Sequence, residues 1–445
     1  MIEAGNTLSP RQRGILGRLA GGLTTDAADV AADRAQAAPP LRRNRDFQIL
    51  WAAQVVSTLG GQASGIALPL LVLAITGSPA KVGITAAAVT LPRLLLILHA
   101  GALADRLNRK LMMIACDGIR AIAVASVAVL YLTGHLPFWV LPLIAFVEGT
   151  GSVFFEIAER AAIPQIVHDQ QLPAAIAQNQ VRNYGAWLGG PPLGGVLFAA
   201  GRAIPFVVDA VSYVVSFVAL LFIKTPFQQT RSTAPGRLRK EIVEGVLWLW
   251  RQPFLRTTSL LVTGSDMVLN ALFLTIIVVA REGGASSPEI GVMVALLGVG
   301  GLAGAFVAPR LARRLSVRAV VGTTMGVEAA LVPLLIVVRE PLAMGLLLGL
   351  MMALHPLWDV SVGGYQLRVT PDRLQGRTQS VYRLLALGAI PLALVLVGSL
   401  LETIGATATI VAAACTMSVV ALVALTSRAV RDVPETATAP ASAGG

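Results

Sequence analysis

The chain has 445 residues, of which 55% are hydrophobic and only 13% are charged. This composition excludes a soluble protein of this size and indicates a membrane protein. The two cysteines, Cys116 and Cys415, lie in apolar runs, and the four histidines lack metal-ligand spacing. No nucleophile and base pair is recognisable, so we expect neither a disulfide framework, a metal site, a cofactor nor an enzyme.

Apolar runs of about 20 residues, the length that crosses a bilayer, follow one another from Phe47 to Thr426. The first run lacks a short apolar core with a cleavage site, so we expect no cleaved signal peptide. The fold class is therefore an all-α membrane protein with twelve transmembrane helices. We predict these spans: 47–75, 80–103, 111–133, 138–163, 176–200, 205–223, 255–281, 288–309, 319–338, 341–367, 378–401 and 406–427.

The net charge of +11 reports the orientation of the chain rather than nucleic-acid binding. With the N-terminus in the cytoplasm, 27 of the 35 Lys and Arg residues fall in cytoplasmic segments, as the positive-inside rule requires. The cations outside are Lys81, Arg202, Arg281 and Arg339. We therefore expect a multi-pass protein of the cytoplasmic (inner) membrane with both termini cytoplasmic. It contacts anionic lipid, binds no nucleic acid and is a monomer.

The chain divides into two six-helix halves joined by a linker. The expected domains are a disordered cytoplasmic tail (1–40), an N-terminal bundle (41–223), a cytoplasmic linker (224–254), a C-terminal bundle (255–427) and a second disordered tail (428–445). Leu238, Ile242, Val246 and Leu249 recur in the linker at helical spacing. They predict an amphipathic helix, either on the membrane surface or packed on the bundle.

Two loops repeat between the halves. The stretch 101–110 after the second span matches 304–314 after the eighth, at a shift of 203, and the loops after spans four and ten match at a shift of 202. A duplicated six-helix unit is a recurrent transporter plan, in which the substrate site lies between the halves near the membrane midplane.

The loop after the second span resembles the loop 2–3 signature of the major facilitator superfamily. The matching residues are Gly101, Asp105, Arg106, Arg109 and Lys110. Asn108 replaces the usual Gly, and Asn tolerates a left-handed turn. The resemblance implies two pseudo-symmetric six-helix bundles, and we interpret the charged residues as a cytoplasmic gate that contacts the opposite half. The alternative is that these cations only mark topology.

The fifth span resembles the antiporter signature of the same superfamily. It carries Gly190, Pro191, Gly194 and Gly195, with Ala186 in place of the first Gly. Small residues let helices approach closely and prolines bend a helix, so such a helix can act as a rigid rocking element. The resemblance to antiporters implies export rather than import. The alternative is tight packing without any bearing on direction. The stretches 155–167 and 206–213 further resemble the branch of macrolide efflux proteins and the enterobactin exporter, although Glu156 stands where that branch often has proline.

Carboxyl groups inside the spans are candidates for ion coupling, because a charge at mid-bilayer costs roughly 2.5–3.5 kcal/mol on insertion scales. Glu148, Asp266 and Glu328 lie near the midplane and are the proton-coupling candidates. We expect Asp117 to pair with Arg120, one turn away. Secondary candidates are Asp117, Glu156, Asp209, Asp359, Arg93, Arg182 and Arg383, the three arginines being alternative structural partners of the midplane acids. Glu156 and Asp359 are nearly equivalent in the two halves and could serve the cytoplasmic gate.

The leading interpretation is a secondary active transporter that exports small amphipathic molecules by alternating access, in exchange for protons. Drugs and secreted metabolites such as siderophores or antibiotics are the expected cargo, and membrane lipid is the surrounding partner. One alternative is an uptake or lipid-moving transporter of the same fold. The other is a transporter-like sensor that moves nothing.

Overall fold

A computed structural model describes residues 40–227 and 238–433 of the chain. The predicted tails, up to residue 39 and from residue 434, and the linker segment 228–237 lie outside the described residues. Within the described ranges the chain is helical and contains no strand. Eleven of the described helices, counting interrupted ones once, are long and apolar enough to cross a membrane.

The N-terminal half consists of a short 3₁₀ turn and six long helices. They are η1 (Leu41–Arg43), α2 (Arg45–Thr76), α3 (Pro79–Arg106), α4 (Arg109–Leu132), α5 (Val140–Ile166), α6 (Leu172–Ala200) and α7 (Ile204–Phe222), with a second 3₁₀ turn, η2 (Asp169–Gln171), before α6. Only α6 falls outside the eleven apolar helices. Its 29 residues still reach about 43 Å, and it lies between α2 and the C-terminal half, so it is the twelfth spanning helix. The predicted twelve-helix fold is confirmed.

The C-terminal half also crosses six times, but three of its crossings are interrupted. Its elements are α9 (Pro253–Glu282), α10 (Ser287–Ala312), α11 (Val317–Leu331) with η3 (Val332–Ile336), α12 (Pro341–Met352) with α13 (His355–Trp358), the π-helical turn η4 (Asp359–Gly363) and α14 (Gly364–Val369), α15 (Asp372–Gly388) with α16 (Ile390–Thr403), and α17 (Gly405–Thr426) with α18 (Arg428–Arg431). Pro333, Pro356 and Pro391 lie at the interruptions, where a missing backbone N–H ends regular helix pairing.

Side chains cap the beginnings of several helices. Asn108 accepts a hydrogen bond from the backbone N–H of Leu111 at 3.2 Å and has φ −63° and ψ 111°. The expected left-handed turn at Asn108 is therefore wrong. The residue replaces glycine because Asn is a good N-cap, which satisfies a free backbone donor at the start of α4.

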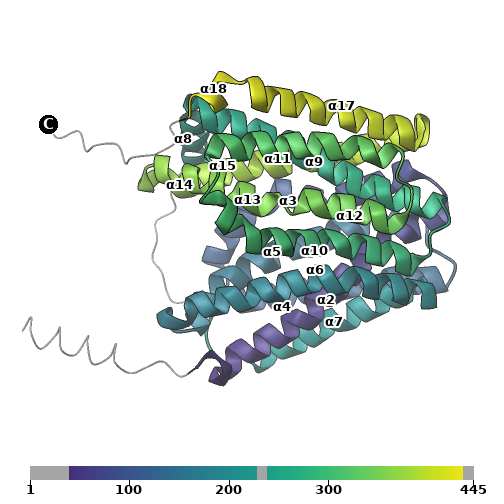
Figure 1. Cartoon of the computed structure of the whole chain (residues 1–445). Helices are drawn as coiled ribbons and strands as arrows, with labels where there is room; N and C mark the ends of the chain where they lie inside the picture. Colours follow the sequence, from purple (N-terminus) through teal and green to yellow (C-terminus); the bar gives the residue numbers. More distant parts are fainter. Residues whose placement is uncertain (1–39, 228–237, 434–445) are drawn as a thin grey trace, which may run out of the picture.

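The linker helix α8 (Leu238–Arg251) packs on α9 and α15. Leu249 is fully buried there, whereas Val243, Leu247 and Trp250 are exposed at 45–52%. The helix therefore packs on the bundle and still presents an apolar face outward. Figure 1 shows α8, α14 and α18 at one end of the molecule; we call this end the α8 side and the opposite end the far side.

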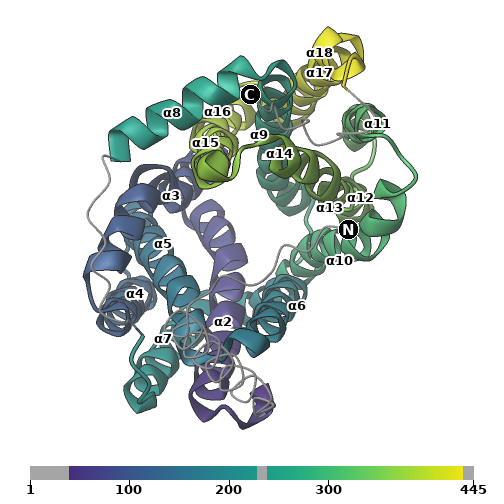
Figure 2. The same ribbon diagram turned by 90° about the vertical axis from the view of Figure 1, so that its left-hand side faces the viewer.

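The two halves meet along two pairs of helices, α6 with α10 and α3 with α16. Figure 2, viewed from the α8 side, shows α2–α7 gathered apart from α9–α18. A methyl group added at Gly291 would overlap the carbonyl oxygen of Pro191, and one added at Gly83 would overlap that of Leu394. At the far side, the Glu402 carboxylate accepts hydrogen bonds from the Ser78 hydroxyl and from the Ala80 backbone N–H across the interface.

Candidate transport site

A buried ion-pair network joins three helices of the N-terminal half around Arg120 on α4. Its Nη2 donates to Glu148 Oε1 on α5 at 2.7 Å and to the Tyr213 hydroxyl on α7 at 2.5 Å. The guanidinium also lies over the Tyr213 ring, 4.0 Å from its centroid, a favourable cation–π geometry. Arg120 Nη1 is 4.0 Å from Oδ1 of the fully buried Asp117. The predicted pairing is thus present, but Glu148 is the closer partner.

Asp209 on α7 extends this network toward α2. The Ser64 hydroxyl donates to Asp209 Oδ2 at 2.5 Å, and the Ser212 hydroxyl to Oδ1 at 3.3 Å. A side chain at Gly60 would collide with Ser212, whose Oγ lies 2.5 Å from an ideal Cβ there. Glycine therefore permits the close approach of α2 and α7 that places Ser64 on Asp209.

Three further arginines of the N-terminal half pair with acids on α5. Arg93 Nη2 contacts Glu156 Oε2 at 2.6 Å, and Arg160 bonds the other oxygen of Glu156. Arg182 on α6 makes two hydrogen bonds to Glu159, at 2.6 and 3.3 Å, and both side chains are more than nine-tenths buried. The expectation that Arg93 or Arg182 partners a midplane acid is wrong, because both reach acids nearer the α8 side. The side chain of Arg383 lies outside the described residues.

A second acidic cluster lies in the C-terminal half. Glu328 on α11 is 2% exposed and accepts a 2.6 Å hydrogen bond from the Ser265 hydroxyl on α9. Its other oxygen is 3.9 Å from His355 Nε2 on α13. Asp266 interacts electrostatically with both Glu328 and Asp359. Within the described part of the chain, neither Glu328 nor Asp266 forms a salt bridge with a lysine or arginine.

The acidic cluster adjoins an irregular part of its helix. Asp359 is exposed and begins the π-helical turn η4, a distortion that often occurs at functional sites. The neighbouring Trp358 donates its indole N–H to the Tyr382 hydroxyl on α15 at 2.9 Å. This bond fixes the position of η4 relative to α15.

The gate residues lie at the α8 side of the N-terminal half. Arg109 donates to the carbonyl oxygens of Ala104, Ala161 and Phe227 at 2.7–3.3 Å, and Lys110 to that of Ile223 at 2.6 Å. These bonds join α3, α4, α5 and the end of α7 within one half. Arg106 is exposed, and Gly101 has open space around its Cα. The side chain of Asp105 lies outside the described residues.

The antiporter-like motif of α6 lies at two helix contacts. Added methyl groups at Gly190 and Gly194 would overlap Gln62 and Ala63 of α2, and one at Gly195 would overlap the Ser287 carbonyl of α10. The small residues therefore place α6 tightly between its own half and the other half.

Sequence reasoning missed several members of these networks. Glu159 lies inside the predicted fourth span, one turn after Glu156, and this position could have identified it. Tyr213, Ser64, Ser265 and His355 carry no such signal, because only helix rotation determines that they face the buried acids.

The fold and these networks define a class: a membrane transporter of two pseudo-symmetric six-helix halves, not an enzyme. The chain matches the transmembrane secretion effector family over residues 35–443 and belongs to it. It is 30% identical over 403 residues to the multidrug efflux pump Tap of Mycolicibacterium fortuitum, covering 85% of this chain and 94% of the relative. It is 25% identical to macrolide efflux protein A of Streptococcus pyogenes, covering 51% of this chain and 57% of that protein.

Solved structures agree on the fold. An inward-facing bacterial homologue of the iron transporter ferroportin superposes with a TM-score of 0.68 at 17% identity, over 86% of this chain and 98% of that one. An inward-facing bacterial homologue of the lysosomal transporter Spinster also gives 0.68, at 14% identity, over 88% and 98%. The family match and the two efflux relatives confirm the resemblance to the drug and macrolide efflux branch.

Proposed function

We propose that this chain exports small amphipathic molecules, including drugs, across the cytoplasmic membrane by alternating access and in exchange for protons. The names of its relatives support drug export, and the close α6–α10 and α3–α16 contacts supply two lines about which the halves can rock. The α8 side is cytoplasmic in this proposal, because exposed cations gather there. They include Arg42, Arg43, Arg106, Lys224, Arg313 and Arg314.

The main support for proton exchange comes from the neighbours of Glu328, which do not include an arginine or lysine among the described residues. Arg120 is a permanent cation and forms a salt bridge with Glu148. Protonation of Glu148 would therefore leave the buried guanidinium of Arg120 without this partner. Glu328 instead contacts a serine and a histidine, and histidine gains or loses charge near neutral pH. Burial penalises the charged form of a carboxyl group, so Glu328 can carry a proton without breaking an arginine pair. Asp266, which interacts with Glu328 electrostatically, is the second candidate.

The test reconstitutes the full chain in liposomes and follows a radiolabelled macrolide. Two modes are measured: accumulation driven by an acidic lumen, and exchange down the macrolide gradient at equal pH. We expect Glu328→Gln to lose accumulation, to the level of protein-free liposomes, and to keep exchange, because the variant cannot release a proton. Asp266→Asn should weaken accumulation less, since Glu328 remains.

Glu282→Gln is the matched control, because Glu282 is exposed at the far end of α9 and should transport like the wild type. Full accumulation by both Glu328→Gln and Asp266→Asn would place the proton route elsewhere. Absence of both modes in the wild type would refute export of this cargo and favour a non-transporting role.

We further propose that Asp105 and Arg109 form a cytoplasmic gate. Arg109 connects α3 and α5 with the chain after α7, so the three move together when the halves rock. Asp105→Asn and Arg109→Ala should insert normally but export more slowly, measured as macrolide efflux from cells at matched expression. Wild-type rates in both variants would leave the motif only a topological role.

A further inference from the structure

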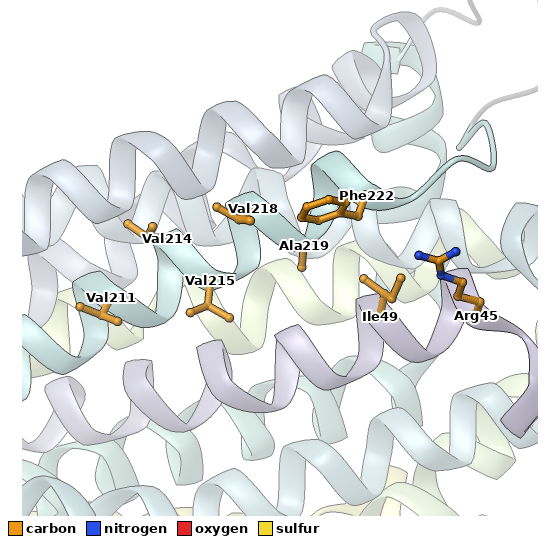
Figure 3. A pocket seen from close by; sticks show the side chains of 8 residues that line it. All are labelled: Arg45, Ile49, Val211, Val214, Val215, Val218, Ala219 and Phe222. Carbon is orange, nitrogen blue, oxygen red and sulfur yellow. The ribbon is translucent and has the colours of Figure 1, made fainter.

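A groove lies on the membrane-facing surface of the N-terminal half, between α2 and α7. Its volume is about 520 Å³. The wall on α7 consists of exposed apolar side chains, among them Val211 at 55%, Val215 at 42% and Phe222 at 63% exposure. Ile49 of α2 forms the opposite wall, and Arg45 closes the end at the α8 side, as Figure 3 shows. The groove is therefore apolar along its length and cationic at one end.

The length of the groove matches one leaflet of a bilayer. From Val211 to Phe222 the helix α7 rises by about 16 Å, and half of a bilayer's hydrocarbon core is about 15 Å thick. Arg45 is the first residue of α2 and therefore lies where the hydrocarbon gives way to headgroups. An acyl chain in the groove would place its phosphate at this guanidinium.

The charge of Arg45 is available to such a phosphate. Arg45 is exposed, and within the described residues its guanidinium makes no salt bridge or side-chain hydrogen bond. The adjacent Asp46 interacts electrostatically with Arg45, but its hydrogen bonds go elsewhere: Oδ2 accepts from the backbone N–H groups of Thr225 at 2.8 Å and Lys224 at 3.2 Å. These bonds tie the start of α2 to the end of α7 and so fix the mouth of the groove.

We propose that this groove is a binding site for an anionic phospholipid of the cytoplasmic leaflet, with one acyl chain along α7 and the phosphate on Arg45. Arginine binds phosphate through two parallel N–H donors, and basic pockets between membrane helices are suited to anionic headgroups. The proposal rests on the orientation proposed above, which decides the leaflet. It does not depend on the cargo or on proton exchange.

The test is native mass spectrometry of the full chain in detergent, with added phosphatidylglycerol or phosphatidylcholine of identical acyl chains. We expect the wild type to retain phosphatidylglycerol preferentially. Arg45→Gln should lower its retention about five-fold, the effect of one cation near an anionic headgroup. Val215→Trp fills the groove and should lower the retention of both lipids.

Two variants serve as matched controls. Arg42→Gln removes an exposed cation close to Arg45 that does not line the groove, and Leu392→Trp adds the same bulk at a 74% exposed position of α16. Both should retain lipid like the wild type. Equal retention of the two lipids by the wild type would overturn the proposal. So would wild-type retention in Arg45→Gln and Val215→Trp, or an equal loss in Arg42→Gln. Transport is not measured, so failure of the export proposal would not affect the result.

Discussion

Contacts with arginine divide the acids of the membrane-spanning helices into two kinds. Glu148, Glu156 and Glu159 each have a guanidinium within 2.7 Å, so a fixed cation neutralises each of them. Glu328 instead accepts a hydrogen bond from the Ser265 hydroxyl at 2.6 Å and lies 3.9 Å from His355 Nε2. Arg120 and Glu328 lie at the same distance along their helices, counted from the first residues of α4 and α11.

The Arg182–Glu159 pair should stabilise the N-terminal half, because its side chains are only 7% and 8% exposed. Arg182→Ala leaves an uncompensated buried carboxylate, which costs about 3–5 kcal/mol. We expect a clearly lower melting temperature in detergent. Arg160→Ala is the control, since Arg160 is 62% exposed and an exposed pair contributes about 0.2–1 kcal/mol. Equal melting temperatures for the two variants would show that burial does not strengthen the first pair.

The sequence could identify the acids inside the apolar runs and the Asp117–Arg120 contact within one helix, but not the partners that lie on other helices. Glu148, Asp266 and Glu328 were identifiable because a charge inside an apolar run is rare. Arg120 meets Glu148 across two helices, and this contact depends on how α4 and α5 are rotated about their axes. The expected pairs with Arg93 and Arg182 therefore failed, and both arginines instead pair with acids of α5.

At the scale of elements, α6 and α10 form the closest backbone contact between the halves. Gly195 of α6 meets the Ser287 carbonyl, and Gly291 of α10 meets the carbonyl of Pro191. Each helix thus presents a glycine to the backbone of the other. Such contacts let two helices slide or tilt with little side-chain repacking.

Gly291→Leu should separate α6 from α10, because its side chain would collide with the backbone of Pro191. Overpacking costs about 1–3 kcal/mol, and we expect slower macrolide efflux together with a lower melting temperature. Gly301→Leu on the same helix is the matched control, since no heavy atom lies within 4 Å of an ideal Cβ there. Similar losses in both variants would attribute the effect to leucine in α10 rather than to the contact.

For the helices, the sequence predicted the membrane crossings but not the interruptions within them. Hydropathy and charge predicted the crossings, including α6, which is not among the eleven strongly apolar helices. The interruptions in α12–α14 and α15–α16 were not predicted. A window of about 20 residues averages over a π turn or a proline, so the distortion beside Asp359 leaves no hydropathy signal.

At the scale of the whole molecule, the two lines of contact and the charge asymmetry have separate roles. Glu402 joins the halves at the far side through the first turn of α3. A carboxylate is favourable there, because the N-terminus of a helix carries partial positive charge. The described hydrogen bonds of Arg109 stay within one half. This arrangement suits a conformation closed at the far side.

The orientation of this arrangement is the last prediction. We expect the α8 side to be cytoplasmic, because exposed cations gather there and transferring clustered Lys and Arg across the membrane is unfavourable. Single cysteines at His135 and Arg202 of the far side should react with an impermeant maleimide in intact cells, in a background in which Cys116 and Cys415 are serine. Cysteines at Arg106 and Lys224 should react only after permeabilisation. Both far-side positions are exposed, so burial cannot explain a missing signal.

Reaction of residue 135 or 202 from the cytoplasmic side would overturn the topology. It would also assign the opposite direction of transport to the same conformations and move the lipid groove to the outer leaflet.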